Sequence, residues 1–256
     1  MLTINFKDFP VNDGDLVLDL GCGEGRHVIN AYLQANIIAL GVDLSLRDLT
    51  TAHLRFAAFA LGSEASSTES ITENSTENGV KNNFVRQFHL QQADATCLPF
   101  GDASIDKIIC SEVLEHIENY RDVLREIDRV LKPNGTLAIS VPRAWPEKIC
   151  WWLSAAYHEN EGGHIRIFNA NKLRADIEVF GFIFTGRHWA HALHVPFWWL
   201  KCLWWKSQDK SCIIKQYHRL LVWDLMCRPW FTQTLERWLN PIMGKSVVMY
   251  FKKPGS

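Results

Sequence analysis

A short apolar segment that leads directly into a glycine-rich turn is the feature that most limits how this chain can fold. Residues 16–20 (LVLDL) have the length and composition of a buried strand, and Gly21-Cys-Gly-Glu-Gly25 follows at once. A helical pattern then runs from Arg26 to Leu33. A strand, a glycine turn and a helix in this order are typical of α/β proteins, in which backbone N–H groups at the start of the helix face a ligand.

The alternation of strands and helices continues along the chain. We expect further strands at 37–42, 84–91, 105–110 and 136–141. Apolar residues at helical spacing lie between them, most clearly in residues 120–131. Five strands that alternate with helices predict an α/β fold with a parallel sheet covered on both faces. Two later strands, at 182–191 and 246–252, are expected to pair antiparallel at one edge.

Two segments interrupt this pattern within what we expect to be a single domain, residues 1–256. Residues 62–83 are rich in Ser, Thr, Glu and Asn, which predicts a flexible low-complexity insertion. Residues 195–245 are expected to form a helical insertion before the last strand, and its first part (VPFWWLKCLWWK) is rich in tryptophan and lysine. The pattern fits a lid whose tryptophans contact the rest of the protein, and it fits equally a helix lying in a membrane interface.

Charge and cysteine content exclude several classes of protein. The net charge is −1, although residues 1–144 carry a balance of −8 and the rest +7, so we do not expect nucleic acid as a partner. The seven cysteines contain no CxxC pair, which argues against a zinc module and a disulfide framework and for a reducing compartment. No secretory signal or apolar run of about 20 residues is present. We therefore expect a cytoplasmic protein, with peripheral attachment to the cytoplasmic face of a membrane left open.

Three aspartates lie in or directly after the first three expected strands. Asp19 comes two residues before the glycine turn, Asp43 ends the second strand, and Asp94 follows the third. Because ligands of such sheets bind beyond the carboxyl ends of the strands, these carboxylates could meet an ammonium group, ribose hydroxyls and an adenine amine, respectively. The alternatives are that Asp43 only caps the next helix and that Asp94 only organises the turn before Pro99.

Together with Ser111-Glu-Val-Leu-Glu-His116, these motifs resemble the class I S-adenosylmethionine-dependent methyltransferases, and within them the type-11 branch that includes quinone-biosynthesis methyltransferases. The resemblance covers about residues 15–145 and implies a Rossmann-like, seven-stranded sheet of order 3-2-1-4-5-7-6 in which only the seventh strand is antiparallel. It implies S-adenosylmethionine as the cofactor. The cofactor-binding residues that it implies are Asp19, Gly21, Gly23, Gly25, Asp43, Leu44, Asp94, Ala95, Ser111 and Glu112.

The expected function is methyl transfer from S-adenosylmethionine to a small, hydrophobic or lipid-like acceptor. A catalytic base is needed only if the acceptor arrives protonated, and the candidates are His116 and His164. Some quinone O-methyltransferases bind a divalent cation at an E-x-x-E-H sequence, which Glu112, Glu115 and His116 match here, but we expect these residues to line the pocket and no metal to bind. The alternatives are a methyltransferase acting on protein or RNA, and a non-catalytic scaffold that retains the fold.

Overall fold

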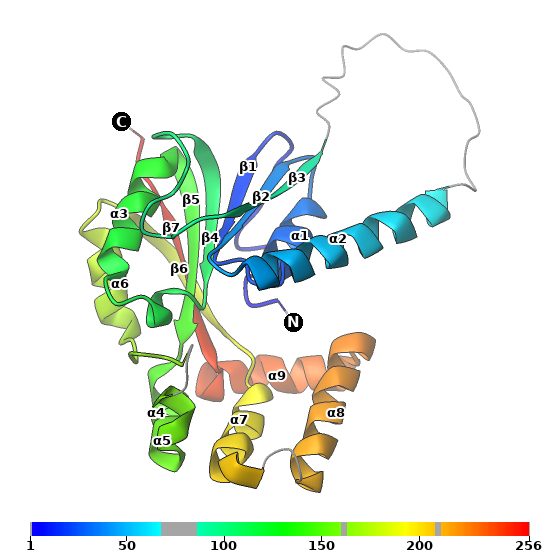
Figure 1. Ribbon diagram of the computed structural model, residues 1–256. Helices are drawn as coiled ribbons and strands as arrows, with labels where there is room; N and C mark the ends of the chain where they lie inside the picture. The colour runs from blue at the N-terminus through cyan, green and yellow to red at the C-terminus, as the bar shows by residue number, and fades with distance from the viewer. Residues whose placement is uncertain (1, 68–85, 160–162, 208–210, 256) are drawn as a thin grey trace.

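The computed structural model describes residues 2–67, 86–159, 163–207 and 211–255. Its strands are β1 (Leu16–Leu20), β2 (Ile38–Asp43), β3 (Gln87–Gln92), β4 (Ile105–Ser111), β5 (Leu131–Pro142), β6 (Ile183–Ala190) and β7 (Ser246–Lys252). They form one sheet of order β3-β2-β1-β4-β5-β7-β6 (Figure 1). The five strands β1 to β5 pair in parallel, and β7 runs antiparallel to both β5 and β6. The predicted strand order and the antiparallel seventh strand are confirmed.

Side chains alternate between the two faces of the sheet, so the strands other than the edge strands β3 and β6 contribute to two hydrophobic clusters. Leu18 and Ile108 pack beneath α3 (Tyr120–Val130) and α6 (Ala170–Glu178) on one face. Val17 and Ile109 face the N-terminal segment, α1 (Arg26–Tyr32) and the start of α2 (Leu46–Ser67). Burial of each such side chain contributes about 1.5–3 kcal/mol, and the two layers together hold the carboxyl ends of the strands in fixed positions.

Two element boundaries differ from the sequence-based prediction. Helix α3 ends at Val130, and β5 begins at the next residue instead of at 136. The register between β4 and β5 shifts here, since Ile105 pairs with Leu131 but Lys107 pairs with Thr136. The Lys-Pro-Asn-Gly sequence that follows Leu131 is therefore accommodated as an irregularity in the strand rather than as a separate turn.

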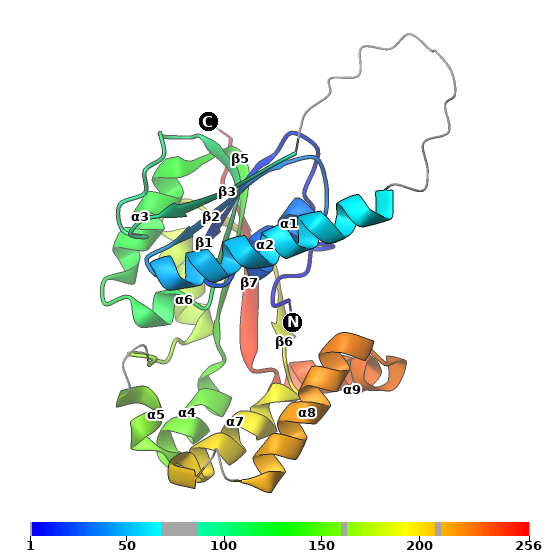
Figure 2. The same ribbon diagram turned by 45° about the vertical axis from the view of Figure 1, so that its right-hand side comes forward.

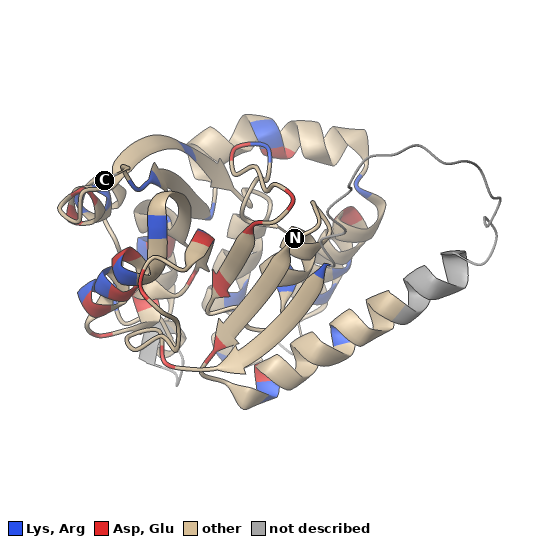
Figure 3. Cartoon of the chain, turned by 90° about the horizontal axis from the view of Figure 1, so that it is seen from above, with Lys and Arg blue, Asp and Glu red and all other residues tan. Residues whose placement is uncertain are grey.

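The predicted insertion at 62–83 lies mostly outside the described residues. Helix α2 extends to Ser67, so residues 62–67 continue this helix. Figure 3 shows basic and acidic residues mixed over the part of the chain that is described, and few of them lie on α2.

A group of helices lies beyond the end of the sheet where β5 and β6 terminate (Figures 1 and 2). The helices α4 (Ala144–Leu153) and α5 (Ala155–Glu159) follow β5. The segment predicted as the tryptophan-rich insertion forms α7 (His194–Leu203), the 3₁₀ turn η2 (Trp205–Ser207), α8 (Cys212–Cys227) and α9 (Trp230–Met243). Because β1 to β5 are parallel, this group lies at the same end of the sheet as the glycine turn. Within the described residues, no helix is both long enough and apolar enough to cross a bilayer.

The tryptophans of α7 and η2 pack mainly on neighbouring helices. Trp199 donates a hydrogen bond from Nε1 to the carbonyl of Pro146 in α4, at 3.2 Å. Trp198 and Trp205 contact the ring of Tyr157 in α5, with ring centroids 5.9 and 6.1 Å apart. These contacts attach the start of the insertion to the helices that follow β5.

Candidate functional site

The glycine turn between β1 and α1 adopts a backbone that favours glycine. Gly21, Gly23 and Gly25 have φ angles of +71°, +50° and +85°, in the left-handed region. A Cβ atom on Gly21 would lie 2.3 Å from a methyl carbon of Val113, which leaves no space for a side chain. The turn thus brings a bare backbone close to the residues that follow β4.

Asp43, the last residue of β2, holds the glycine turn in place. Its Oδ2 accepts a hydrogen bond from the Gly23 amide at 2.7 Å, and its Oδ1 accepts one from the Ser45 amide at 2.8 Å. The second bond fixes the turn that leads into α2, whose cap is Ser45, since the Asp48 amide donates to Ser45 Oγ at 3.2 Å. A carboxylate has about four acceptor positions, so these two bonds still leave capacity for hydroxyl donors.

Asp19 lies in β1 but faces the opposite way from Leu20. Its Oδ2 accepts a hydrogen bond from the Val28 amide in α1 at 2.9 Å, while its Oδ1 is buried without a partner among the described residues. Burial raises the pKa of this carboxyl to about 7. The structure does not place Asp19 among the residues that line the pocket described next, so the expected convergence of three carboxylates in one hollow is met by Asp43 and Asp94 only.

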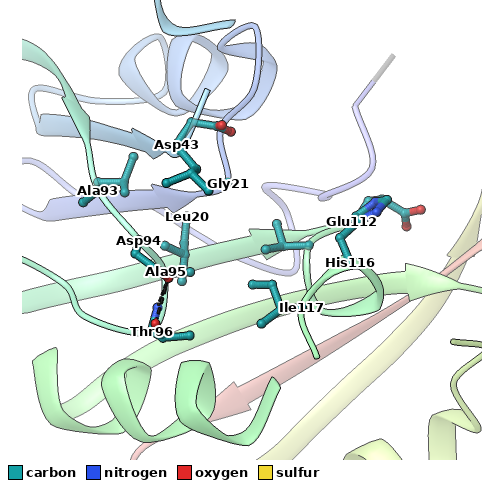
Figure 4. Close-up of a pocket in the computed structure, with 13 residues that line it drawn as sticks. Leu20, Gly21, Asp43, Ala93, Asp94, Ala95, Thr96, Glu112, His116 and Ile117 are labelled. Carbon is teal, nitrogen blue, oxygen red and sulfur yellow. Dashed lines mark hydrogen bonds between the residues drawn. The ribbon is translucent and has the colours of Figure 1, made fainter. Parts of the chain in front are cut away.

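A pocket of about 460 Å³ lies at the carboxyl ends of β1, β2 and β4 and beside the loop after β3 (Figure 4). It brings together six of the ten predicted cofactor-binding residues and one candidate base. Its lining residues are Leu20, Gly21, Val42, Asp43, Leu44, Ala93, Asp94, Ala95, Thr96, Glu112, Val113, His116 and Ile117. The predicted site residues that do not line it are Asp19, Gly23, Gly25, Ser111 and His164.

The loop after β3 supplies one wall of this pocket. Asp94 is exposed, and its Oδ1 accepts hydrogen bonds from the amide and the hydroxyl of Thr96, both at 2.8 Å (Figure 4). Asp94 therefore organises its turn, as the alternative interpretation expected, and lines the pocket as well. Leu44, which also lines the pocket, is 68% exposed, so its side chain is available to contact a flat apolar ring.

The end of β4 carries a short chain of hydrogen bonds. The hydroxyls of Ser111 and Ser140 lie 2.8 Å apart, and Ser140 donates to Glu112 Oε1 at 3.2 Å. Ser111 is thus directed at β5 rather than at the pocket. Glu112 has a φ angle of +58°, and Lys245 Nζ lies 3.9 Å from its Oε2. A non-glycine residue held in the left-handed region is often found at functional sites.

A second group of residues adjoins the pocket through His116. The rings of His116 and His164 lie 5.0 Å apart, and donor atoms of Glu115, His116 and His164 come within 4.8 Å of one another. Both carboxylate oxygens of Glu115 are buried without a partner among the described residues. Burial, with the nearby charge of Glu112, raises the pKa of Glu115 well above its usual range.

His164 forms a pair with Glu147 that the sequence did not reveal. His164 Nδ1 lies 2.6 Å from Glu147 Oε1, and Tyr157 donates to Glu147 Oε2 at 3.4 Å. Burial opposes the charge of Glu147, but the hydrogen bond and charge of His164, the charge of Lys245 and the bond from Tyr157 together outweigh it and lower the pKa of this carboxyl. An imidazole oriented by a buried carboxylate at Nδ1 can accept a proton at Nε2. Glu147 lies in α4, and no sequence signal distinguishes it from an ordinary surface glutamate.

The strand order, the glycine turn and the pocket at the carboxyl ends of the strands define the class I methyltransferase fold. A family model described as a methyltransferase domain matches residues 7–184, and the chain belongs to this family.

Among curated proteins, the chain is 28% identical over 130 residues to a 27-O-demethylrifamycin SV methyltransferase of Amycolatopsis mediterranei. It is 30% identical over 138 residues to a demethylmenaquinone methyltransferase of Lactobacillus johnsonii. These alignments cover 51% and 52% of this chain but only 39% and 46% of the relatives, so the chain spans less than half of their length.

Solved structures share the fold at low sequence identity. An S-adenosylmethionine-dependent methyltransferase from Methanosarcina mazei superposes with a TM-score of 0.55 at 13% identity, with both chains fully covered. One from Mesorhizobium loti gives a TM-score of 0.52 at 14% identity and covers 96% of this chain and 94% of its own.

Proposed function

We propose that the protein transfers a methyl group from S-adenosylmethionine to a small, hydrophobic acceptor. The observation that carries this proposal is the single pocket that joins the bare backbone of Gly21 to Asp43, Leu44, Asp94 and Glu112. A nucleoside needs hydroxyl acceptors, an apolar contact for its base and a close backbone approach, and these residues supply all three. The family match to a methyltransferase domain supports this cofactor.

In this proposal, Asp43 accepts hydrogen bonds from the ribose hydroxyls, and Leu44 covers the adenine, whose edge faces Asp94 and Ala95. The glycine turn takes the methionine end. The unpartnered, buried Oδ1 of Asp19 fits an ammonium group, because a cation there would stabilise a carboxylate that is otherwise costly to ionise. The bound cofactor supplies a sulfonium methyl group, which is transferred in a direct displacement.

The acceptor is proposed to bind beside Val113, Ile117 and His116, at the end of the pocket nearest to the His164–Glu147 pair. His164, held by Glu147 through Nδ1, takes the proton from an acceptor hydroxyl as the methyl group arrives. The chain's main contribution is to align the acceptor with the methyl group and to exclude water. The two curated relatives carry names that describe action on small molecules, which supports an acceptor of this size.

We further propose that the helical group contacts a lipid surface from which a lipid-like acceptor enters. The supporting feature is the apolar side chains that α8 and α9 leave exposed. Met226, Trp230 and Trp238 are 77%, 78% and 75% exposed. Exposed tryptophan beside basic residues is typical of helices that lie in a membrane interface, and residues 145–256 carry a charge balance of +7 that favours anionic lipid.

The activity is tested with the purified chain, methyl-labelled S-adenosylmethionine and a panel of hydroxylated quinols and fatty acyl compounds. We expect label in at least one organic-soluble product. His164→Gln should reduce kcat by about 10²–10⁴-fold for a hydroxyl acceptor, since general-base catalysis contributes about this much. His218→Gln, an exposed histidine of α8, is the matched control and should retain the rate. Equal rates in His164→Gln and the wild type would contradict the assigned base.

A further inference from the structure

A cluster of metal-ligating side chains lies where the helical insertion joins the sheet, away from the methyltransferase pocket. His191 follows the end of β6, His194 begins α7, and Glu236 belongs to α9. One donor atom from each of these three residues lies within 4.8 Å of the other two. Figures 1 and 2 agree in showing the end of β6, the start of α7 and α9 side by side at this point.

Each residue of this cluster has a buried polar atom that lacks a partner in the described part of the chain. His191 Nδ1, His194 Nδ1 and Glu236 Oε1 have no hydrogen-bond partner among the described residues, and the same holds for Asp224 Oδ1 in α8. His191 and Asp224 are each only 8% exposed. Buried polar atoms are nearly always satisfied in folded proteins, so four unpartnered ones in one region suit a site for a bound ion or water.

The ring of His191 is already oriented for such a ligand. Its Nε2 lies 3.0 Å from the hydroxyl of Thr3, which can accept the ring proton. The lone pair is then on Nδ1, the nitrogen without a partner. Metal-binding histidines usually donate their second nitrogen to a neighbour in this way, which fixes both the tautomer and the ring plane.

We propose that His191, His194 and Glu236 bind a zinc ion that ties the helical segment 194–243 to the sheet. Two imidazole nitrogens and one carboxylate are a ligand set that Zn²⁺ prefers, and Asp224 or a water molecule completes the tetrahedron. Zinc ligands at about 2.0–2.2 Å are roughly 3.4 Å apart, so the side chains would move inward by about 1 Å. This differs from the sequence-based expectation that no metal binds.

The surroundings provide both a path for the ion and a structural role for it. A cavity of about 320 Å³ is lined by Thr3, His191 and Glu236, so the cluster can be reached from the surface. The loop between β6 and α7 is also joined to α9, because the Ala192 amide donates a hydrogen bond to Asn240 Oδ1 at 3.0 Å. A zinc ion would reinforce this junction, because metal bound only by the folded state adds to its stability.

The test uses the full chain, stripped with a chelator, with zinc chloride as the probe. Because Glu115, His116 and His164 form a second group that could bind zinc, all variants are made in a His164→Gln background. Zinc affinity is measured by titration calorimetry, and the melting temperature is measured with and without zinc. Within this background, His194→Gln and Glu236→Gln each remove one proposed ligand. Thr3→Val removes the hydroxyl beside His191, and His218→Gln is the control.

We expect one equivalent of zinc to bind to the His164→Gln background and to raise its melting temperature. His194→Gln and Glu236→Gln should abolish both effects, and Thr3→Val should weaken the affinity by about 10–100-fold, as the loss of a ligand's orienting partner usually does. The His218→Gln control should bind normally. No zinc binding by the folded background protein, or equal affinity in the background and both ligand variants, would overturn the proposal. Circular dichroism establishes whether each protein is folded. If a ligand variant does not fold, the zinc titration of the His164→Gln background protein decides the test.

Discussion

Asp43 shows how one carboxylate serves both the fold and the proposed function. Its two oxygens hold the amides of Gly23 and Ser45, so the same side chain shapes the glycine turn and the loop that carries Leu44. Substitution here therefore alters the pocket even before a ligand is considered. A residue that lines a binding site and also supports it is difficult to assign from sequence, because each role alone explains an aspartate at this position.

Asp19 makes the folded protein less stable as the pH rises, which is the opposite of the usual effect of an aspartate. Its pKa of about 7 in the folded chain lies above the ordinary value of 3.8, so the folded state binds more protons than the unfolded state between these values. The contribution of Asp19 to stability is therefore present below about pH 4 and is lost as the pH rises to about 7.

We predict that Asp19→Asn removes this dependence. The amide oxygen of asparagine can still accept the bond from Val28, but it carries no charge to bury. The free energy of unfolding of the ligand-free variant should exceed that of the wild type at pH 7.5 by an amount on the order of 2–4 kcal/mol, and the difference should vanish near pH 4. Urea unfolding at both pH values measures it. A difference that is the same at both pH values would show that Asp19 is not the titrating group.

At the scale of elements, the sequence located the strands well, and the family resemblance supplied their order. Short, largely apolar runs between turn residues placed all seven strands, because such runs are typical of β-strands. The direction of a side chain was predicted less well. Asp19 and Ser111 occupy the expected strands, but Asp19 faces α1 and Ser111 faces Ser140.

Contacts between distant segments were beyond sequence reasoning. Glu147 of α4 meets His164 of the segment before α6, and Glu236 of α9 meets His191 of the loop after β6, only because the fold brings these helices and loops together. Local patterns carry no information about such pairs. The helices α4 and α5 were likewise not predicted, although they support the tryptophans of α7.

The exposed face of α8 and α9 gives a prediction about membranes. Trp230→Ser with Trp238→Ser should reduce sedimentation with anionic phospholipid vesicles by about tenfold or more, because burying one large apolar side chain is worth about 1.5–3 kcal/mol and 1.4 kcal/mol corresponds to tenfold. The matched control replaces Trp198 and Trp199, which already contact α4 and α5. If neither the wild type nor either double variant sediments with vesicles, the helical group is a lid and not a membrane contact.

At the scale of the whole molecule, the sheet and the helical group divide the proposed task. The sheet holds the proposed cofactor pocket at the carboxyl ends of its first strands, and the helical group lies at the same end, where an acceptor would arrive (Figure 1). The position of Lys245 illustrates the connection. It directly precedes β7, and its Nζ lies 3.9 Å from Glu112 in the pocket and 5.4 Å from the ring of Trp198 in α7.

Titration of the full chain with S-adenosylhomocysteine, the methyl-free form of the proposed cofactor, tests the nucleoside pocket most directly. We predict one binding site in the wild type, affinity at least tenfold weaker in Asp43→Ala, and unchanged affinity in Asp122→Ala, which replaces an aspartate of α3 outside the pocket. Loss of one charge-assisted hydrogen bond to the ribose, at about 1.5–3 kcal/mol, already accounts for a tenfold change. Absence of binding by folded wild-type protein, or equal affinity in Asp43→Ala and the wild type, would contradict the account.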